Sequence, residues 1–315
     1  MKKKITVFLI FTFLIIFSAC SKQENKLIIF HAGSLTVPFK QVIKEFQKEN
    51  PDVKIEKEIA GSRACARKIA DLNKTCDVFA SADYTVIDKL LIPDYADWNI
   101  KFASNEMAIV FTEKSKYKNK INGENWAQIL LKDDVSFGRS DPNADPCGYR
   151  TVLTIKLAEK YFGEKGLAEK LLGKDVKYIR PKEVDLLALL ETGELDYIFL
   201  YRSVAKQHGL EFLILPDSIN LKDNKLSDFY KTVSVEISGK KPGEKITKKG
   251  APMVYGITIP KNNQNKLMAE KFLKFLLSEK GMEIMQANGQ PSVVPTVTST
   301  YNRIPKSLKK FAKGN

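Results

Sequence analysis

Short apolar segments alternate with stretches of helical periodicity along most of this 315-residue chain, and this alternation constrains the fold more than any other feature. Residues 27–30 form a compact apolar run that ends in a turn, and residues 35–49 then place apolar side chains on one helical face. The same order of strand and helix follows over residues 53–72 and 77–91. Strands that alternate with helices predict an α/β domain with a largely parallel sheet.

The pattern restarts after an apolar strand at residues 107–111, which predicts a second α/β lobe. Further extended segments are expected at residues 135–137, 176–179, 197–201, 212–215, 232–237 and 253–259, and helices at 126–131, 150–161, 181–190, 262–277 and 279–287. The stretch 217–228 is polar, and the basic stretch 238–250 is predicted to be a loop. Two α/β lobes predict a cleft between them, with ligands bound where strands lead into helices.

The N-terminus has the pattern of an export signal. Three lysines precede a short apolar segment, and two small residues precede Cys20, as in a lipobox. We expect residues 1–19 to be removed, Cys20 to be lipidated, and residues 20–26 to tether the protein to a membrane facing the periplasm or the cell exterior. A plain signal peptide or an uncleaved anchor is the alternative.

The composition is that of a globular protein, with 43% hydrophobic and 28% charged residues, and it excludes a disordered or collagen-like chain. The formal net charge is +14, from 51 basic and 37 acidic residues. Removal of three lysines with the signal leaves 48 basic residues and a net charge of +11. Export and the even mixing of basic with acidic residues argue against a nucleic-acid partner and favour steering of a small anion, or solubility.

Cysteine and histidine are scarce. If Cys20 is lipidated, Cys65, Cys76 and Cys147 remain, and three cysteines cannot all pair. A Cys65–Cys76 disulfide is an open alternative, but the chain is not expected to be a disulfide-stapled scaffold. No CxxC motif occurs and only two histidines are present, so zinc or haem chemistry has few ligands. We expect no cofactor.

Two glycine-serine turns follow predicted strands and precede predicted helices. Gly33 and Ser34 form the first, and Gly61 and Ser62 form the second. Glycine allows close approach of a ligand, serine supplies a hydroxyl and an N–H, and the helix N-terminus favours negative charge. Serine is also a good helix N-cap, so capping alone is the alternative for either turn. Their repetition in neighbouring units favours an oxyanion site.

Two acidic residues stand at similar junctions. Asp145 precedes Pro146 and Cys147 in a proline-rich turn, which suits an N-cap with proline at the first helical position. Glu183 lies in the first turn of the helix predicted at 181–190, where the helix dipole favours a carboxylate. Capping and helix electrostatics are therefore the alternatives to ligand binding.

The similarity to a known family lies in these segments: HAGSLTVPF (31–39), AGS (60–62), DVFASADY (77–84), DPNADPCGYR (141–150), ETGELDY (191–197), YRSVAKQHG (201–209) and PMVYGITIPK (252–261). Through them the chain resembles the archaeal-type tungstate/molybdate-binding proteins of ABC importers. The resemblance implies the two-lobed periplasmic-binding-protein fold (type II), with hinge strands and the ligand in the interlobe cleft. It implies a first lobe of residues 27–107 plus 235–315 and a second of 108–234, a monomer, and an ABC permease as partner.

The resemblance also implies a ligand set. In that family four oxo groups and two protein carboxylates surround the metal octahedrally, and the matching carboxylates here are Asp145 and Glu183. The other matching positions are Gly33, Ser34, Ser62, Pro146, Cys147 and Tyr201. Mo(VI) and W(VI) accept oxygen ligands beyond four, whereas sulfate and phosphate do not. Two acids would therefore favour molybdate or tungstate and repel the other anions.

The predicted function is capture and delivery of tungstate or molybdate, without catalysis. A sulfate- or phosphate-type receptor is one alternative, and a secreted hydrolase that uses Asp145 and Glu183 as an acid/base pair is another. A Cys147 nucleophile with His31 or His208 is disfavoured, because His208 lies in a polar segment and is expected at the surface.

The remaining conspicuous residues receive structural interpretations. Arg63 is expected to face solvent from its helix, with contact to an anion beside Ser62 as the alternative. Trp98 and Trp126 are expected to pack in the core. The two lobes are expected to close around the ligand by a hinge motion.

Overall fold

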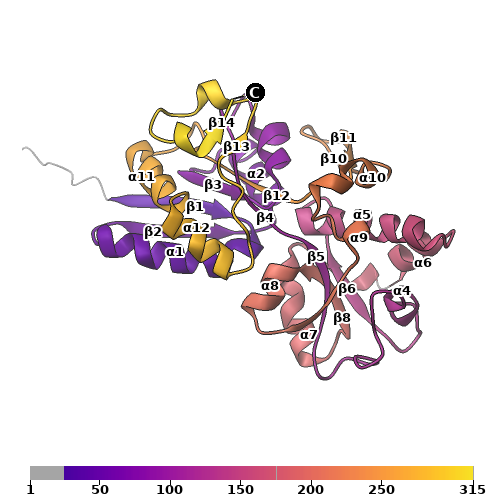
Figure 1. The fold of residues 1–315 in the computed structure, drawn as a ribbon. Coiled ribbons are helices and arrows are strands. Elements are labelled where there is room, and N and C mark those ends of the chain that lie inside the picture. Colours follow the sequence, from indigo (N-terminus) through magenta and orange to yellow (C-terminus); the bar gives the residue numbers. More distant parts are fainter. Residues whose placement is uncertain (1–24, 175, 315) are drawn as a thin grey trace, which may run out of the picture.

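The computed structural model describes residues 25–174 and 176–314. The predicted signal, Cys20 and most of the tether lie outside the described residues. Two five-stranded sheets, each flanked by helices, form two lobes that lie side by side (Figure 1). In the part of the chain that the structure describes, no helix is long and apolar enough to cross a membrane.

The first sheet combines strands from both ends of the chain. Its order is β2 (Lys54–Ile59), β1 (Lys26–His31), β3 (Val78–Ser81), β12 (Val254–Thr258) and β4 (Ile100–Ser104). Strand β1 is parallel to β2 and β3, whereas β12 is antiparallel to β3 and β4. Because β4 leads out of this lobe and β12 leads back in, the two run in opposite directions.

The second sheet has the order β7 (Ile179–Arg180), β6 (Phe137–Ser140), β8 (Tyr197–Tyr201), β5 (Met107–Phe111) and β9 (Glu211–Ile214). Strand β6 is parallel to β7 and β8, and β5 is antiparallel to β8 and β9. The two sheets are therefore mixed, and the prediction of a largely parallel sheet is wrong where the chain crosses between lobes. The strands β1 to β4 end toward the second lobe, and β6, β7 and β8 end toward the first.

Helices cover the sheets. Around the first sheet lie α1 (Thr36–Glu49), α2 (Ser62–Ala70), α3 (Tyr84–Val86), the π-helical turn η2 (Ile87–Leu91), α11 (Lys266–Leu276) and α12 (Glu279–Ala287). The second lobe contains α4 (Trp126–Leu130), α5 (Pro146–Phe162), α6 (Leu167–Gly173), α7 (Leu187–Thr192), α8 (Arg202–Gln207), α9 (Asp217–Asn220) and α10 (Ser227–Tyr230). Short 3-10 turns complete the chain: η1 (Gly33–Leu35), η3 (Val176–Tyr178), η4 (Glu183–Leu186), η5 (Asn224–Leu226), η6 (Tyr301–Arg303) and η7 (Lys309–Phe311).

Aromatic side chains fasten the helices of each lobe. Phe46 of α1 meets Phe272 of α11 edge to face, with ring centroids 5.3 Å apart. In the second lobe, Trp126 packs edge to face on Phe199 of β8 at 5.9 Å. Complete burial of one such side chain contributes about 1.5–3 kcal/mol. Both tryptophans are buried, as the sequence predicted: Trp98 is 5% exposed and Trp126 is fully buried.

Several predicted elements change in detail. Residues 176–178 form a 3-10 turn, and only Ile179 and Arg180 extend the sheet. Strand β6 begins at Phe137, and α5 begins at Pro146, four residues earlier than predicted, because Asp145 caps it. The polar stretch 217–228 includes α9 and η5 and the start of α10.

The basic stretch 238–250 was predicted to be a loop, and this is wrong for its second half. Strand β11 (Lys245–Lys249) pairs antiparallel with β10 (Ser234–Ser238) to form a hairpin. The sequence of β11 is rich in lysine and has no apolar run, so composition does not reveal the strand. Its backbone pairing with β10 defines it. The hairpin lies beside α5 (Figure 1), where Lys156 Nζ donates to the Ser234 carbonyl at 2.6 Å. The lobe boundaries at 107/108 and 234/235 stay a prediction.

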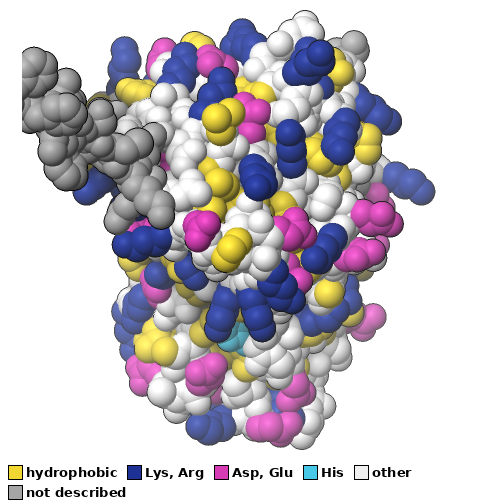
Figure 2. Space-filling view, turned by 90° about the vertical axis from the view of Figure 1, so that its left-hand side faces the viewer, with side chains coloured by type: hydrophobic (Ala, Val, Ile, Leu, Met, Phe, Trp, Pro, Cys, Tyr) yellow, Lys and Arg dark blue, Asp and Glu magenta, His cyan; other side chains and the backbone are white. Residues whose placement is uncertain are grey.

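A second small sheet pairs β13 (Thr296–Val297) with β14 (Ala312–Lys313) beside the first lobe. At the surface, basic and acidic side chains are intermingled over the face shown in Figure 2 rather than separated into one basic field. This distribution agrees with the expectation that the positive charge is spread along the chain.

Candidate functional site

The first glycine-serine turn of the first lobe faces Glu183 of the second. A Cβ atom added to Gly33 would lie 3.1 Å from Glu183 Oε1 and 3.2 Å from Oε2. Gly33 follows β1 and Glu183 follows β7, so both stand at the ends of strands that point across the junction. The absence of a side chain at Gly33 therefore leaves the Glu183 carboxylate directly against the backbone of the turn.

The second turn faces the Asp145 segment in the same way. A Cβ atom on Gly61 would lie only 2.4 Å from the Ala144 carbonyl oxygen and 3.0 Å from Asp145 Cβ. The Ala64 N–H, in the first turn of α2, donates to that carbonyl at 3.2 Å. Only glycine fits at position 61 in this arrangement, because a neighbouring backbone oxygen cannot move away as a side chain can.

The two predicted carboxylates are brought together at this junction. Asp145 Oδ1 accepts from the Cys147 N–H at 3.2 Å and so caps α5, with Pro146 in the first turn as predicted. Its Oδ2 accepts from the Glu183 N–H at 2.9 Å. Asp145 is 1% exposed and Glu183 is fully buried. Capping is thus present, but it leaves the side chain of Glu183 unexplained.

The Glu183 side chain lacks partners. Neither carboxylate oxygen of Glu183 has a hydrogen-bond partner among the described residues, although both are buried. Burial, and next the repulsion from Asp145, raise the pKa of Glu183 well above its usual value. Burial also raises the pKa of Asp145, against the opposing effects of the adjacent Glu183 side chain and of the backbone N–H groups that donate to Asp145. A buried pair of acids without a compensating cation is unfavourable for the protein alone.

The serine hydroxyls do not cap their helices, so the capping alternative is wrong for both turns. Ser34 Oγ accepts from the Tyr255 hydroxyl at 3.0 Å, and Ser62 Oγ accepts from the Ala82 N–H at 2.9 Å. A hydroxyl that accepts a hydrogen bond still has its own proton to donate. Both serines are fully buried at the junction, and they are therefore set to donate to an acceptor such as an oxyanion oxygen.

Cys147 and Tyr201 are buried structural neighbours of this site. The Cys147 thiol contacts the Phe199 carbonyl at 3.8 Å, and burial raises the pKa of that thiol well above its usual value. Tyr201 accepts from Arg150 Nη1 at 2.9 Å. A protonated thiol is a poor nucleophile, so the chemistry of Cys147 does not support the cysteine-nucleophile alternative.

The two histidines are separated by their environments. His31 is fully buried, with Nδ1 2.8 Å from the Ala32 carbonyl oxygen, and burial lowers its pKa to about 4. His208 is exposed after α8, as predicted.

All three described cysteines are free and buried. Cys65 and Cys76 form no disulfide.

Sequence reasoning missed several residues that support the site. Tyr255, in the middle of β12, accepts from Asn105 Nδ2 at 2.9 Å and donates to Ser34. Asn105 lies in the crossing between β4 and β5, and it also donates to Ser203 Oγ at 2.7 Å. A hydrogen-bonded path thus links the crossing to the first glycine-serine turn. The signal in the sequence is a tyrosine within a buried strand, because a buried tyrosine hydroxyl needs a hydrogen-bond partner.

The expectation for Arg63 is wrong. Arg63 is 2% exposed, and it donates from Nε to the Asn143 carbonyl at 3.0 Å and from Nη2 to the Ser238 carbonyl. The helix position suggested solvent, but the second lobe and the hairpin cover that face of α2.

Within residues 25–174 and 176–314, no group of three or more histidine, cysteine or acidic side chains is arranged to hold a metal ion. The junction supplies two carboxylates and two donor hydroxyls.

Two α/β lobes with donors and buried acids at their junction define the class of two-lobed periplasmic binding proteins. The chain belongs to the family of bacterial extracellular solute-binding proteins, which it matches over residues 27–290. Members of this family bind solutes for transporters. The predicted fold and the predicted family resemblance are both confirmed.

Individual relatives are similar over nearly their whole length. The chain is 46% identical to the molybdate/tungstate-binding protein WtpA of Pyrococcus abyssi, covering 91% of this chain and 90% of that one. It is 50% identical to an uncharacterized solute-binding protein of Petrotoga mobilis, covering 98% and 96%. The periplasmic molybdate-binding protein of Azotobacter vinelandii has the same fold, with a TM-score of 0.61 and 18% identity over 85% of this chain and 99% of that one.

Proposed function

We propose that this protein captures tungstate or molybdate outside the cytoplasm and delivers it to the permease of an ABC importer. The observation that carries the proposal is the buried acid pair: beside Asp145, both carboxylate oxygens of Glu183 lack a hydrogen-bond partner among the residues that the structure describes. Such a pair is unfavourable unless a strongly electron-poor centre compensates it. The names of the WtpA relatives support the same ligand class.

The proposed roles follow from the chemistry of each group. Asp145 and Glu183 add carboxylate oxygens to the metal of the oxyanion, because Mo(VI) and W(VI) accept ligands beyond their four oxo groups. Ser34 and Ser62 donate to oxo oxygens, since each hydroxyl already accepts a bond from the protein. Gly33 lets the ligand and the Glu183 carboxylate approach the backbone closely.

The other proposed site residues act around these groups. Pro146 fixes the first turn of α5 after Asp145, and the Cys147 N–H holds the aspartate in place. Tyr201, at the end of β8, is bound by Arg150 beside the same junction. We expect these residues to shape the site and to exclude water.

The acids also account for selectivity. Sulfate and phosphate cannot add two carboxylates at their central atom, so the pair would meet them as unpaired like charge in a buried site. A sulfate- or phosphate-type receptor needs donors at these positions instead. The hydrolase alternative is disfavoured because the family consists of solute-binding proteins.

Titration calorimetry of the soluble protein with tungstate, molybdate, sulfate and phosphate tests the proposal. We expect tight one-to-one binding of tungstate or molybdate and weak or undetectable binding of the other two anions. X-ray absorption at the tungsten edge should show six oxygen neighbours in two distance shells. Tight sulfate binding, or a four-oxygen spectrum, would contradict the role of the acids.

We further propose that Cys20 carries the lipid that holds the protein, as a monomer, at the membrane near its permease. Replacement of Cys20 by alanine should release the protein from membranes in soluble form. Stable attachment needs more than one acyl chain, because a single chain binds reversibly. Unchanged membrane retention of Cys20→Ala would instead indicate an uncleaved N-terminal helix.

A further inference from the structure

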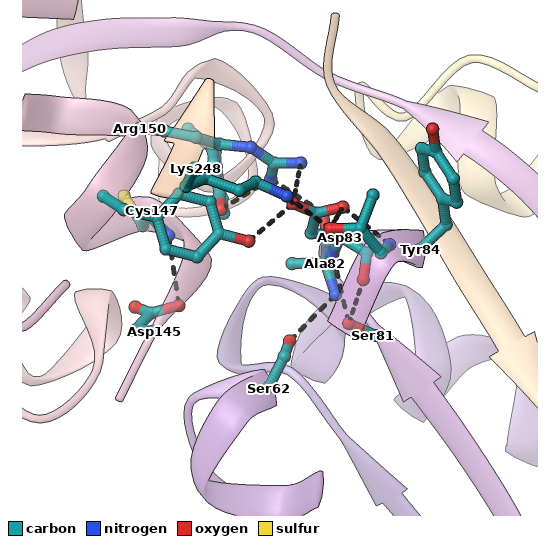
Figure 3. Close-up of polar contacts among 12 residues, drawn as sticks. Ser62, Ser81, Ala82, Asp83, Tyr84, Asp145, Cys147, Arg150 and Lys248 are labelled. Atoms are coloured by element: carbon teal, nitrogen blue, oxygen red, sulfur yellow. Dashed lines mark hydrogen bonds and ion pairs between the residues drawn. The ribbon is translucent and has the colours of Figure 1, made fainter. Parts of the chain in front are cut away.

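A second cluster of buried charge spans the two lobes beside the acid pair. Asp83 follows β3 of the first lobe, and its Oδ2 accepts from the Tyr149 hydroxyl at 2.6 Å and from Lys248 Nζ at 2.5 Å. Arg150 Nη2 lies 3.8 Å from the same oxygen. Figure 3 shows the Arg150 and Lys248 side chains converging on Asp83. All three partners come from outside the first sheet.

The cluster is largely shielded from solvent, and Lys248 is its most exposed member. The Asp83 side chain is 5% exposed, that of Arg150 is 4% exposed and that of Lys248 is 18% exposed. Arg150 also donates from Nη1 to the Ala82 carbonyl at 2.7 Å, which fastens α5 to the end of β3 a second time. Charges buried to this degree are stable only while they are paired.

Part of the Asp83 side chain stays within its own lobe. Asp83 Oδ1 accepts from the N–H and from the hydroxyl of Thr85, both at 2.9 Å, and so caps α3. The two oxygens therefore have separate tasks: Oδ1 maintains local structure, and Oδ2 is bonded across the junction. Opening of the lobes would break the bonds of Tyr149 and Arg150 to Oδ2 and the bond of Arg150 to the Ala82 carbonyl, whereas Oδ1 would keep its bonds to Thr85.

The β10–β11 hairpin carries Lys248 and is itself held from both sides. Asn143 Oδ1, next to the acid segment, accepts from the Ser238 N–H at 2.9 Å. From α2 of the first lobe, Arg67 Nη2 donates to the Gly239 carbonyl at 2.7 Å. The hairpin thus bridges the same two surfaces that meet around Asp83.

We propose that Asp83, Tyr149, Arg150 and Lys248 form an interlobe latch, which prolongs the closed form of the protein without contacting the bound anion. Within the described residues, none of these four side chains is hydrogen-bonded to Asp145 or Glu183. The latch rests on the proposed function for its ligand but not for its closure. The bonds of Tyr149 and Arg150 join the lobes directly, and Lys248 reaches Asp83 from the hairpin that contacts both. Its four members are positioning residues.

Lys248→Met and Asp83→Asn test the latch. Asparagine keeps an oxygen to cap α3 but loses the charge, and methionine keeps the length of the lysine stem. Lys240→Met is the matched control, because Lys240 lies on the same hairpin and pairs with Asp94, but the two side chains are 34% and 57% exposed. The readout is the rate of tungstate release. It is measured by stopped flow after the complex is mixed with a chelator of tungstate or with excess molybdate.

Both latch variants should release tungstate at least about tenfold faster, because truncation of one partner of a buried charge pair acts mainly on dissociation. The control should stay within about twofold, as exposed pairs contribute little. The six-oxygen absorption spectrum of bound tungstate should be unchanged in every variant. Tyr149→Phe, which removes only one hydroxyl, provides a milder variant whose folding is secure and whose release should be faster than that of the control.

Amide hydrogen exchange without any anion separates the latch from the proposed ligand. Residues 82–86 and 238–248 should exchange faster in Lys248→Met than in the wild type, and Lys240→Met should match the wild type. Equal exchange and equal release in all variants would overturn the latch even if tungstate binds tightly. If the wild type does not bind tungstate but exchange differs as expected, the proposed function fails and the latch stands.

Discussion

The two clusters of buried charge at the interlobe junction are opposites. Around Asp83, the cations Lys248 and Arg150 overcome the effect of burial and lower the pKa of the carboxyl well below its usual value. Around Glu183, burial and the neighbouring Asp145 raise the pKa, and among the described residues neither acid forms an ion pair. The protein completes the first cluster from its own side chains and leaves the second incomplete. This difference supports the roles proposed for them, closure for one cluster and ligand binding for the other.

The incomplete cluster should give the largest effects. Glu183→Gln keeps the shape of the side chain and should weaken tungstate binding by tens-fold or more, since loss of one buried charged partner costs about 2–5 kcal/mol. Without ligand, the free energy of unfolding of the same variant should be higher by about 0.5–2 kcal/mol, because an uncompensated acid is gone. Its unfolding temperature should rise accordingly. Calorimetry and thermal unfolding measure the two effects.

Asp185→Asn is the control for that variant. Asp185 lies two residues along the same turn, its side chain is 34% exposed, and it pairs with Lys182 at 3.4 Å. Neither tungstate affinity nor stability should change appreciably, as exposed pairs contribute about 0–1 kcal/mol. If Glu183→Gln bound tungstate as tightly as the wild type, the acid pair would have only a structural role at the helix N-termini. The contrast with Asp83 would then say nothing about ligand binding.

Gly61→Ala should be next in size, because it acts on the approach of the two lobes. The added Cβ would lie 2.4 Å from the Ala144 carbonyl oxygen, a contact that the backbone cannot relieve without separating α2 from the Asp145 segment. We expect tungstate affinity to fall at least about tenfold, which corresponds to about 1.4 kcal/mol. Small-angle scattering with saturating tungstate should show a larger particle than the wild type.

Gly33→Ala sharpens that result. Its added Cβ would meet Glu183 oxygens at 3.1 and 3.2 Å, and a side chain can move by a few tenths of an ångström where a backbone cannot. The loss of affinity should therefore be smaller than for Gly61→Ala. A larger loss at Gly33 would indicate that the first turn, not the second, limits closure.

The pH dependence of stability should have opposite signs for the two clusters. Because the pKa of Glu183 is raised above its ordinary value of 4.5, the folded protein binds more protons than the unfolded chain above that pH, and stability falls as pH rises. The pKa of Asp83 is lowered from 3.8, so its contribution is present above that pH and is lost as pH falls below it. One proton gives a slope of at most about 1.4 kcal/mol per pH unit.

Unfolding of the ligand-free protein between pH 7 and 8 isolates the acid pair, because Asp83 is ionised in both states there and His31, whose pKa is lowered from 6.5 to about 4, is largely neutral in both. Glu183→Gln should flatten the slope in that window, and Asp83→Asn should leave it unchanged. The slope below pH 4 should instead respond to Asp83→Asn. A wild-type protein that becomes more stable from pH 7 to 8 would show that another group compensates the acid pair.

Sequence patterns were sufficient to predict the two lobes and the placement of the two acids, and insufficient to predict the side chains that join the lobes. Asp145 and Glu183 stand at strand-to-helix junctions that spacing and family segments reveal. Lys248 lies in a stretch whose composition predicts a loop, and Arg63 has the spacing of a solvent-facing helix residue. Arg63 becomes buried, and Lys248 half-buried, only because the hairpin packs against both lobes. Contacts between distant segments have no local signal in the sequence.

The sheet directions illustrate the same limit. Alternating strands and helices predict parallel pairing, and β1, β2 and β3 obey it. Strands β12 and β5 run antiparallel to their neighbours because the chain crosses between the lobes, and the order of crossings is not encoded in the periodicity of any one segment. The crossing itself also places Asn105 within reach of Tyr255, about 150 residues later in the chain.

The smallest expected effect concerns that crossing, and it tests whether the incomplete cluster is coupled to closure. Tyr255→Phe removes the hydroxyl that donates to Ser34 and accepts from Asn105, while Asn105 keeps its bond to Ser203. We expect a loss of about 1 kcal/mol in unfolding free energy, typical of one hydrogen bond. Tungstate affinity should fall several-fold, because Ser34 loses the donor that turns its own proton toward an acceptor. Tyr161→Phe, at a 48% exposed position, is the control and should change neither quantity. If Tyr255→Phe lowers stability but leaves affinity unchanged, the hydroxyl only holds the crossing in place, and the donation from Ser34 does not depend on it.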